Sequence, residues 1–135
     1  MKTQLLKTLQ NSKNYTLAVA EAMPEKSYTF KPIETVWNFN ELIGHVEYGI
    51  KWWEENYVKG NQTDWSPPVV KSNKQQAMDR LVKAYDGLEK TISVGNLSEQ
   101  AIHGFYTTLD HITHHRGQAV TYLRCQGVTP PDYQY

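Results

Sequence analysis

The chain of 135 residues has only one cysteine, Cys125, and so cannot form a disulfide within itself. This cysteine usage suits a reducing compartment. An excess of charge is also missing, because 14 Lys and Arg balance 14 Asp and Glu. Broad affinity for nucleic acid depends on a basic surface that neutralises many phosphates. The neutral balance therefore argues against a nucleic-acid partner.

Long apolar runs are absent as well. The N-terminal stretch Met1–Lys7 carries charge but no apolar segment of signal-peptide length, and Leu17–Ala20 is far too short to span a membrane. We therefore expect no membrane association and a cytoplasmic location. No repeat, low-complexity tract or Gly/Ser linker divides the sequence, so residues 1–135 are expected to form a single domain.

Helix-period apolar spacing and clear stop signals predict an all-α fold with four helices. The first is expected from about Thr3 to Met23, and the second opens at the capping box Asn38–Glu41 and runs to about Val58, with Gly60 as its left-handed cap. The third follows the capping signal Ser72–Gln75 and reaches about Ser93. Because Gly104 weakens the stretch before it, the last helix is expected to start near Thr107 or Thr108 and to stop at Gly127.

Four helices in so short a chain predict a four-helix bundle. The connection from Lys59 to Lys71 contains Trp65, Pro67 and Pro68 and is long for a bundle. It is predicted to be a long crossover between the second and third helices, a lid, or both.

Helical geometry sorts the histidines. At about 100° per residue, His45 lies at the rim of the apolar face of its helix, and Gly49 one turn later leaves room beside it. His111 and His115 are four residues apart and share a face of the last helix. His114 falls on the outward side, whereas the orientation of His103 is not fixed by the pattern.

Three histidines from two helices thus point toward the bundle interior. Such a set can offer three imidazole nitrogens to one metal ion and leave a coordination position open, as catalytic metal sites do. The alternative is that the rim histidines only form local hydrogen bonds in a plain helical bundle that needs no metal. The spacing alone leaves both interpretations open.

A longer motif surrounds the histidine pair. His111–Gln118 reads H-I-T-H-H-R-G-Q and is followed by Tyr122-Leu123-Arg124, by Gly127 and by Pro130-Pro131. This run resembles the C-terminal signature of the DinB/YfiT-like family, H-x-x-x-H-R-G-Q-x-x-x-Y-L-R-x-x-G-x-x-P-P. The earlier segment Trp37–His45 resembles the helix start of that family with its histidine, and the likeness in length and helix order extends over nearly the whole chain.

The resemblance implies a DinB-like four-helix bundle with a long crossover, which often forms a homodimer. It also implies a divalent metal, usually nickel or zinc, held at the positions that His45, His111 and His115 occupy here. Family members include S-transferases and isomerases that use low-molecular-weight thiols such as bacillithiol or mycothiol. The function expected from the resemblance is a metal-dependent enzyme that activates a low-molecular-weight thiol or water for S-transfer or hydrolysis of a small-molecule substrate.

Two rivals remain at this point. One is a non-catalytic, metal-binding, dimeric stress-response protein, and the other is the bundle without metal. The sequence names neither the substrate nor the thiol, and imidazole sites accept several metals.

Few other residues offer chemistry. Trp65 in the proline-bearing connection is the best pocket candidate, because a loop aromatic can close over a site. Trp52 and Tyr48 belong to an aromatic set (Tyr48, Trp52, Trp53 and Tyr57) that could line a pocket or simply fill the core. Glu47 and Asp110 fall on polar arcs and are expected to be solvated. Cys125 is expected to be a semi-buried thiol away from the histidines rather than a nucleophile.

Overall fold

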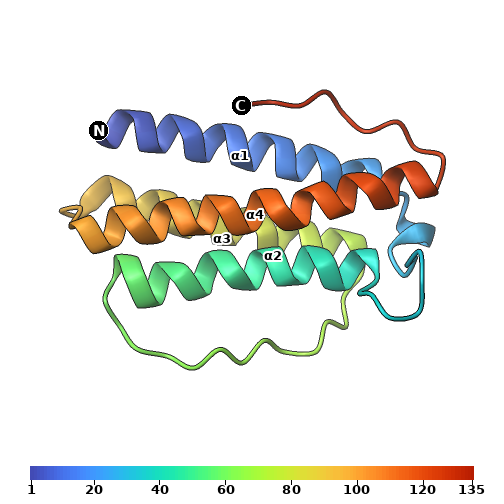
Figure 1. Cartoon of the computed structure of the whole chain (residues 1–135), viewed down its shortest axis with the longest axis horizontal. Helices are drawn as coiled ribbons and strands as arrows, with labels where there is room; N and C mark the ends of the chain where they lie inside the picture. The colour runs from blue at the N-terminus through green and yellow to red at the C-terminus, as the bar shows by residue number, and fades with distance from the viewer.

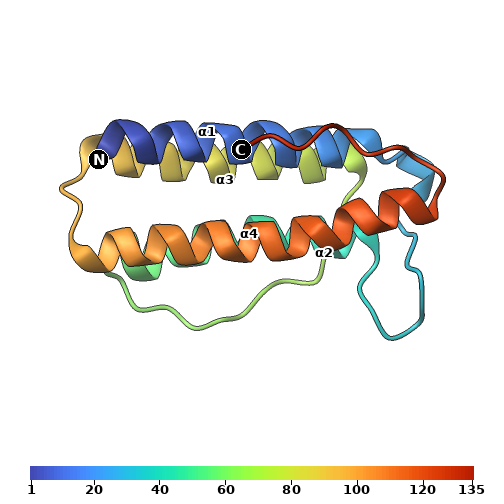
Figure 2. The ribbon, with the colours of Figure 1, turned by 45° about the horizontal axis from the view of Figure 1, so that its top comes forward.

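Four long helices lie side by side in the computed structural model, which describes every residue from 1 to 135. They are α1 (Lys2–Ala22), α2 (Phe39–Trp53), α3 (Lys74–Val94) and α4 (Glu99–Cys125). In Figure 1, α1 and α4 run in one direction, and α2 and α3 run in the other. Figure 2 shows two layers, with α1 beside α3 and α4 beside α2. The predicted all-α four-helix bundle is confirmed, and none of its helices combines the length and the apolar character needed to cross a membrane.

Local capping explains where α2 and α3 begin. The Asn38 side chain accepts a hydrogen bond from the Glu41 amide, and the Glu41 carboxylate accepts one from the Asn38 amide, so the predicted capping box is present. The capping box of α3 lies one residue later than predicted. Its cap is Asn73 rather than Ser72. The Asn73 side chain accepts a hydrogen bond from the Gln76 amide, and the Gln76 side chain accepts one from the Asn73 amide.

The end of α2 widens into a π-helical turn at Glu54–Val58, so helical backbone reaches the predicted end at Val58 in an altered form. Gly60 then takes the left-handed conformation with φ of 77°. Residues 59–73, which we call the crossover segment, return along α2 to the far end of the bundle (Figure 1). Because α2 and α3 point the same way, the predicted long crossover between them is necessary.

The predicted start of the last helix is wrong. α4 begins at Glu99, where the Ser98 side chain accepts a hydrogen bond from the Ala101 amide, and it continues through Gly104 to Cys125. The helix runs through Gly104, and this glycine permits a close contact. A Cβ atom at this position would lie 2.3 Å from Cβ of Tyr57, so only glycine lets the π-helical turn pack against α4.

The core is built from apolar side chains of all four helices, including Leu9, Ile50, Leu81 and Ile112. At one level of this core, a buried guanidinium interrupts the apolar packing. Nη1 of Arg116 donates to the Thr16 hydroxyl over 3.1 Å, and the guanidinium lies over the ring of Tyr15 at 4.8 Å. The Thr16 hydroxyl is in turn 2.9 Å from the Tyr85 hydroxyl.

The C-terminal residues complete this group. Tyr133, in the tail that folds back along α1 (Figure 1), also lies near the guanidinium, at 5.6 Å, and its ring packs edge-on against that of Tyr15 at 5.0 Å. We call Arg116, Thr16, Tyr85, Tyr15 and Tyr133 the arginine cluster.

Candidate metal centre

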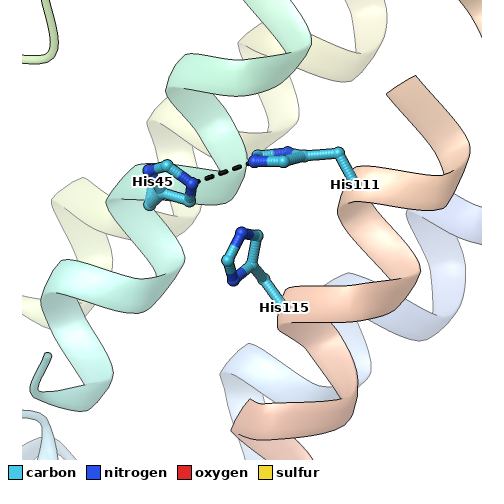
Figure 3. A group of neighbouring side chains, drawn as sticks. All are labelled: His45, His111 and His115. Carbon is cyan, nitrogen blue, oxygen red and sulfur yellow. Dashed lines mark hydrogen bonds between the residues drawn. The ribbon is translucent and has the colours of Figure 1, made fainter. Parts of the chain in front are cut away.

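The structure brings three histidines together on the facing sides of two helices. His45 comes from α2, and His111 and His115 come from α4 (Figure 3). One ring nitrogen of each lies within 4.8 Å of the others, and all three residues are half-buried. We call this group the histidine triad. It is the geometry expected when the rim histidine of α2 faces a pair at i and i+4 on α4.

Two of the rings meet nitrogen to nitrogen. Nε2 of His45 lies 2.9 Å from Nε2 of His111, the contact drawn as a dashed line in Figure 3. The other nitrogen of His111, Nδ1, is buried and has no hydrogen-bond partner. Whichever tautomer His111 adopts, one buried polar atom therefore remains unsatisfied, which costs about 1–3 kcal/mol in a typical interior.

A glycine on α2 provides the space for the His111 ring. A Cβ atom on Gly49 would lie 2.5 Å from Cε1 and 2.6 Å from Nδ1 of His111. The sequence predicted that Gly49 leaves room beside His45. The structure shows that His111, arriving from the opposite helix, uses this room.

His115 is oriented by its own helix. Its Nδ1 donates a hydrogen bond to Oε1 of Gln118 over 2.9 Å, which leaves the lone pair of the neutral ring on Nε2. Histidines that bind metals commonly have such a partner on the second nitrogen, because it fixes the tautomer and the ring orientation. Gln118 was not among the predicted site residues, although its position three residues after His115 was the available signal.

The environment keeps the triad uncharged. Burial, and then the neighbouring His115, lower the pKa of His45 to about 4. Burial, followed by the charges of His115, His45 and His114, lowers the pKa of His111 to about 3. Burial also lowers the pKa of His115, against the hydrogen bond to Gln118, which raises it. At neutral pH the three rings are therefore neutral, which is the form that binds metals.

The donor set fits a divalent metal ion. Three neutral imidazoles suit zinc, nickel, copper or iron(II). Nε2 of His45 and Nε2 of His111 also face each other from different helices, so both atoms could bind the same metal ion. The group could thus hold a metal ion with three protein ligands, and a fourth position would remain open.

Indole rings surround the triad on its outer side. Trp37 lies 4.4 Å from the His45 ring and 5.8 Å from the His115 ring, measured between centroids. Trp53 lies 4.8 Å from the ring of His111. Trp37 was not among the predicted pocket residues; it belongs to the loop before α2, and Tyr122 fixes it by donating a hydrogen bond to its carbonyl oxygen over 2.8 Å.

The three predicted pocket residues form one aromatic group, but only one of them reaches the triad. Trp65 lies 5.6 Å from the ring of His45. Tyr48 and Trp52 pack against Trp65 at 4.9 and 5.4 Å. They also tie down the crossover segment, because the Tyr48 hydroxyl accepts a hydrogen bond from the Ser66 amide and Trp52 Nε1 donates to the carbonyl of Asp64. Their part in binding a substrate stays a prediction.

Other polar residues lie outside the triad. Asp110 and His114 are exposed, as predicted, and so is His103. The prediction that Glu47 is solvated is wrong, since it is 8% exposed and forms an ion pair with Lys51. Cys125 was expected to be semi-buried, but it is exposed at the end of α4, where no core residue covers it.

The comparisons with known proteins agree with this architecture. The family model described as DinB family matches residues 1–101, a range that contains His45 and ends before His111. A crystal structure of a DinB-like protein, YjoA from Bacillus subtilis, superimposes with a TM-score of 0.76 at 19% sequence identity. The match covers 97% of this chain and 98% of that one, so it includes all four helices, and at this identity it supports the fold alone. No curated protein matches the sequence.

Proposed function

The chain belongs to the DinB family, and on that premise we propose that it binds a divalent metal ion through His45, His111 and His115. Nickel or zinc is the metal we expect. We further propose that the protein is an enzyme, which uses the metal to activate a low-molecular-weight thiol or water for S-transfer to, or hydrolysis of, a small-molecule substrate.

One observation carries the proposal. The triad holds three neutral imidazoles within 4.8 Å, and it contains a buried nitrogen without a partner, Nδ1 of His111. Histidines that serve only as polar core residues normally satisfy their hydrogen bonds, as more than nine in ten buried polar groups do. Nδ1 of His111 departs from this rule, but it faces Gly49, so the convergence of the ring nitrogens, with Nε2 of His45 at 2.9 Å from Nε2 of His111, is what supports a ligand-binding role.

The residues around the triad have distinct tasks in this proposal. A divalent metal, when bound, supplies a Lewis acid that lowers the pKa of a thiol or of water toward neutrality. Gln118 keeps the lone pair of His115 on Nε2. Trp37 and Trp65 lie beside His45, where they can contact the apolar part of a substrate and exclude water from the reacting atoms.

Metal content tests the first half of the proposal. Elemental analysis of protein purified without an affinity tag should find about one nickel or zinc ion per chain. His111→Ala should lose the metal, whereas His114→Ala should keep it, because this neighbouring histidine is exposed and not part of the triad. Wild-type protein that remains free of metal after incubation with both ions would reduce the triad to core histidines.

Turnover tests the second half. The metal-loaded protein should convert an electrophile in the presence of one member of a thiol panel, or hydrolyse it, and His115→Ala should abolish the reaction while leaving the far-UV spectrum unchanged. The rival function predicts a different result. Metal that raises the melting temperature, with no turnover for any thiol or for water, would identify a non-catalytic metal-binding protein.

The remaining proposals concern assembly, which the family resemblance implies, and the single domain and location expected from the sequence. We expect a homodimer of single-domain chains that acts in the cytoplasm. Light scattering on the purified protein should give twice the mass of one chain, and a mass of 15.6 kDa would contradict the dimer.

A further inference from the structure

A cavity of about 490 Å³ adjoins the histidine triad, between α2 and the crossover segment. Its floor is the face of α2 that carries Gly44, His45 and Tyr48, and its roof is Pro67–Lys71. Because His45 belongs to both the cavity wall and the triad, a molecule held in the cavity has one side against the triad. This volume is in the range of small-molecule sites.

The roof is fastened at both edges and free between them. At one edge the Ser66 amide donates to the Tyr48 hydroxyl over 2.8 Å, and at the other Asn40 Nδ2 donates to the carbonyl of Ser72 over 2.6 Å. The backbone of Pro67–Lys71 makes no hydrogen bond within the chain. The Val70 side chain rests on α2 at Gly44, where an added Cβ would lie 2.6 Å from it. The segment thus arches over α2 at a fixed place (Figure 1).

The cavity wall carries two acidic and two basic groups, so its formal charges balance, but the partners of these groups differ. Two acidic groups line it, but both are already engaged. The Glu41 carboxylate caps α2, and Glu47 pairs with Lys51. Two basic groups, Lys71 and Arg80, line the same cavity, and neither forms an ion pair in the chain.

Arg80 is held in a definite orientation. Its Nη2 donates to the hydroxyl of Ser72 over 2.7 Å, and Ser72 is itself bonded to Asn40 of α2. A guanidinium has five N–H donors in a planar fork, so most of them remain available after this contact. A planar fork of this kind matches the two oxygens of a carboxylate.

We propose that this cavity binds the carboxylate of a small organic acid through Arg80 and Lys71. The carbon chain of the acid lies against Pro67, Val70 and Trp37, and its other end points toward His45. The role of that acid as substrate or thiol cosubstrate rests on the proposed function, whereas the binding itself requires neither metal nor turnover.

Binding is tested with butyrate, and with butyramide as its uncharged equivalent, on metal-free ¹⁵N-labelled protein. Titration with butyrate should shift the amide signal of Gly44 and the indole signal of Trp37. Saturation should need a butyrate concentration about fivefold or more below that of butyramide, because butyramide carries no charge. Equal binding of the two probes, or no shift at either position, would overturn the proposal.

Two charge-removing variants have matched controls. Lys71→Gln and Arg80→Gln should each weaken butyrate binding by about fivefold, the usual weight of a partly exposed ion pair. Lys83→Gln and Arg124→Gln remove the same charges elsewhere on the surface and should leave it unchanged. The Lys71 side chain makes no hydrogen bond, so its variant reports on binding even if Arg80→Gln disturbs folding. If both controls weaken binding as much as Lys71→Gln does, long-range charge explains the effect and the assignment fails.

A second arm separates this proposal from the proposed function. On zinc-loaded protein, 3-mercaptopropionate should be used with a lower KM than 2-mercaptoethanol, and Lys71→Gln should remove that preference without changing kcat.

The other outcomes are also informative. A preference for an acidic electrophile that is lost in Lys71→Gln would mean that the electrophile carries the carboxylate, and this result would equally support the cavity site. Butyrate binding without any turnover would refute the enzyme but keep the site. If the rate of turnover depends neither on a carboxylate in the reactants nor on Lys71→Gln, the carboxylate site is refuted and the proposed enzymatic function still stands.

Discussion

His115 and Arg116 are consecutive in α4 but belong to two very different polar groups. His115 points toward α2 and joins the histidine triad, whereas Arg116 points toward α1 and joins the arginine cluster. In the arginine cluster, the guanidinium lies against the rings of Tyr15 and Tyr133, and its Nη1 and Nη2 donate to the hydroxyls of Thr16 and Tyr133. In the histidine triad, two ring nitrogens face each other and Nδ1 of His111 has no partner.

This difference suggests that the arginine cluster stabilises the fold and that the histidine triad binds a ligand. A buried polar group that satisfies its own hydrogen bonds helps to specify the packing of the helices around it. A buried polar group that leaves an atom unsatisfied lowers stability, and a ligand that binds only the folded chain would offset this cost. We therefore expect substitutions in the arginine cluster to change folding, and substitutions in the triad to change metal binding.

The largest effect on folding is expected for Arg116→Ala. It removes the donor to Thr16 and leaves a cavity beside the rings of Tyr15 and Tyr133, so the free energy of unfolding should fall by about 2–4 kcal/mol. Urea unfolding of metal-free protein measures this loss, with the exposed Arg124→Ala as control. A variant that keeps wild-type stability but loses its metal would contradict the division between the two groups.

Gly49→Ala should disturb the triad through packing alone. The new Cβ would lie 2.5 Å from the His111 ring, so that ring or the backbone must move. We expect a loss of about 1–3 kcal/mol in unfolding free energy and zinc affinity weakened at least about tenfold, measured with a competing chromophoric chelator. Gly117→Ala is the matched control, because its Cβ meets nothing within 4 Å. It should stabilise α4 by up to about 1 kcal/mol.

Gln118→Leu should weaken metal binding without affecting the fold. The change removes the acceptor that holds Nδ1 of His115, and Gln118 itself is exposed. Loss of such a partner typically costs about 10–100-fold in metal affinity. Gln118→Glu retains an acceptor oxygen and should bind zinc at least as tightly as wild type. If Leu and Glu at this position give the same affinity, the hydrogen bond does not orient the ligand.

A pH dependence is also expected for the metal-free protein. The pKa values of His45 and His111 are about 4 and 3 in the folded chain, below the ordinary value of 6.5. As the pH falls below 6.5, the unfolded chain takes up protons that the folded chain does not, so the free energy of unfolding should decrease between pH 6.5 and about 4. His111→Ala should flatten this slope, as urea midpoints across the range would show. An unchanged slope in that variant would mean that the triad does not cause it.

Features that depend on neighbours in sequence could be predicted. The capping box at Asn38 and Glu41 involves residues three apart, and the common face of His111 and His115 follows from helix geometry. The left-handed glycines that end the helical stretches, Gly60 and Gly127, are likewise local signals. These elements were sufficient to predict four helices and a face on which three histidines could meet.

Features that depend on distant contacts could not be predicted. The start of α4 was misplaced because the role of Gly104 is set by Tyr57, a residue of the π-helical turn far away in sequence. Glu47 was expected in solvent because its arc of α2 is polar, but the crossover segment lies over that arc and shares a cavity with it. Arg80 and Lys71 carry no local motif, and only the path of the crossover segment brings them to one site.

The contour length of the crossover segment has a consequence for the evolution of the molecule. Residues 39–58 form a rod of about 30 Å at 1.5 Å per residue, and an extended chain covers that distance with about nine residues. The crossover segment, residues 59–73, is longer than this minimum, and the slack is taken up as the arch over α2. Insertions or deletions between Ser66 and Ser72 would therefore enlarge or shrink the cavity while the four helices and the three histidines keep their positions. Under the proposed function, the substrate range can change through this segment while the histidine triad keeps its geometry.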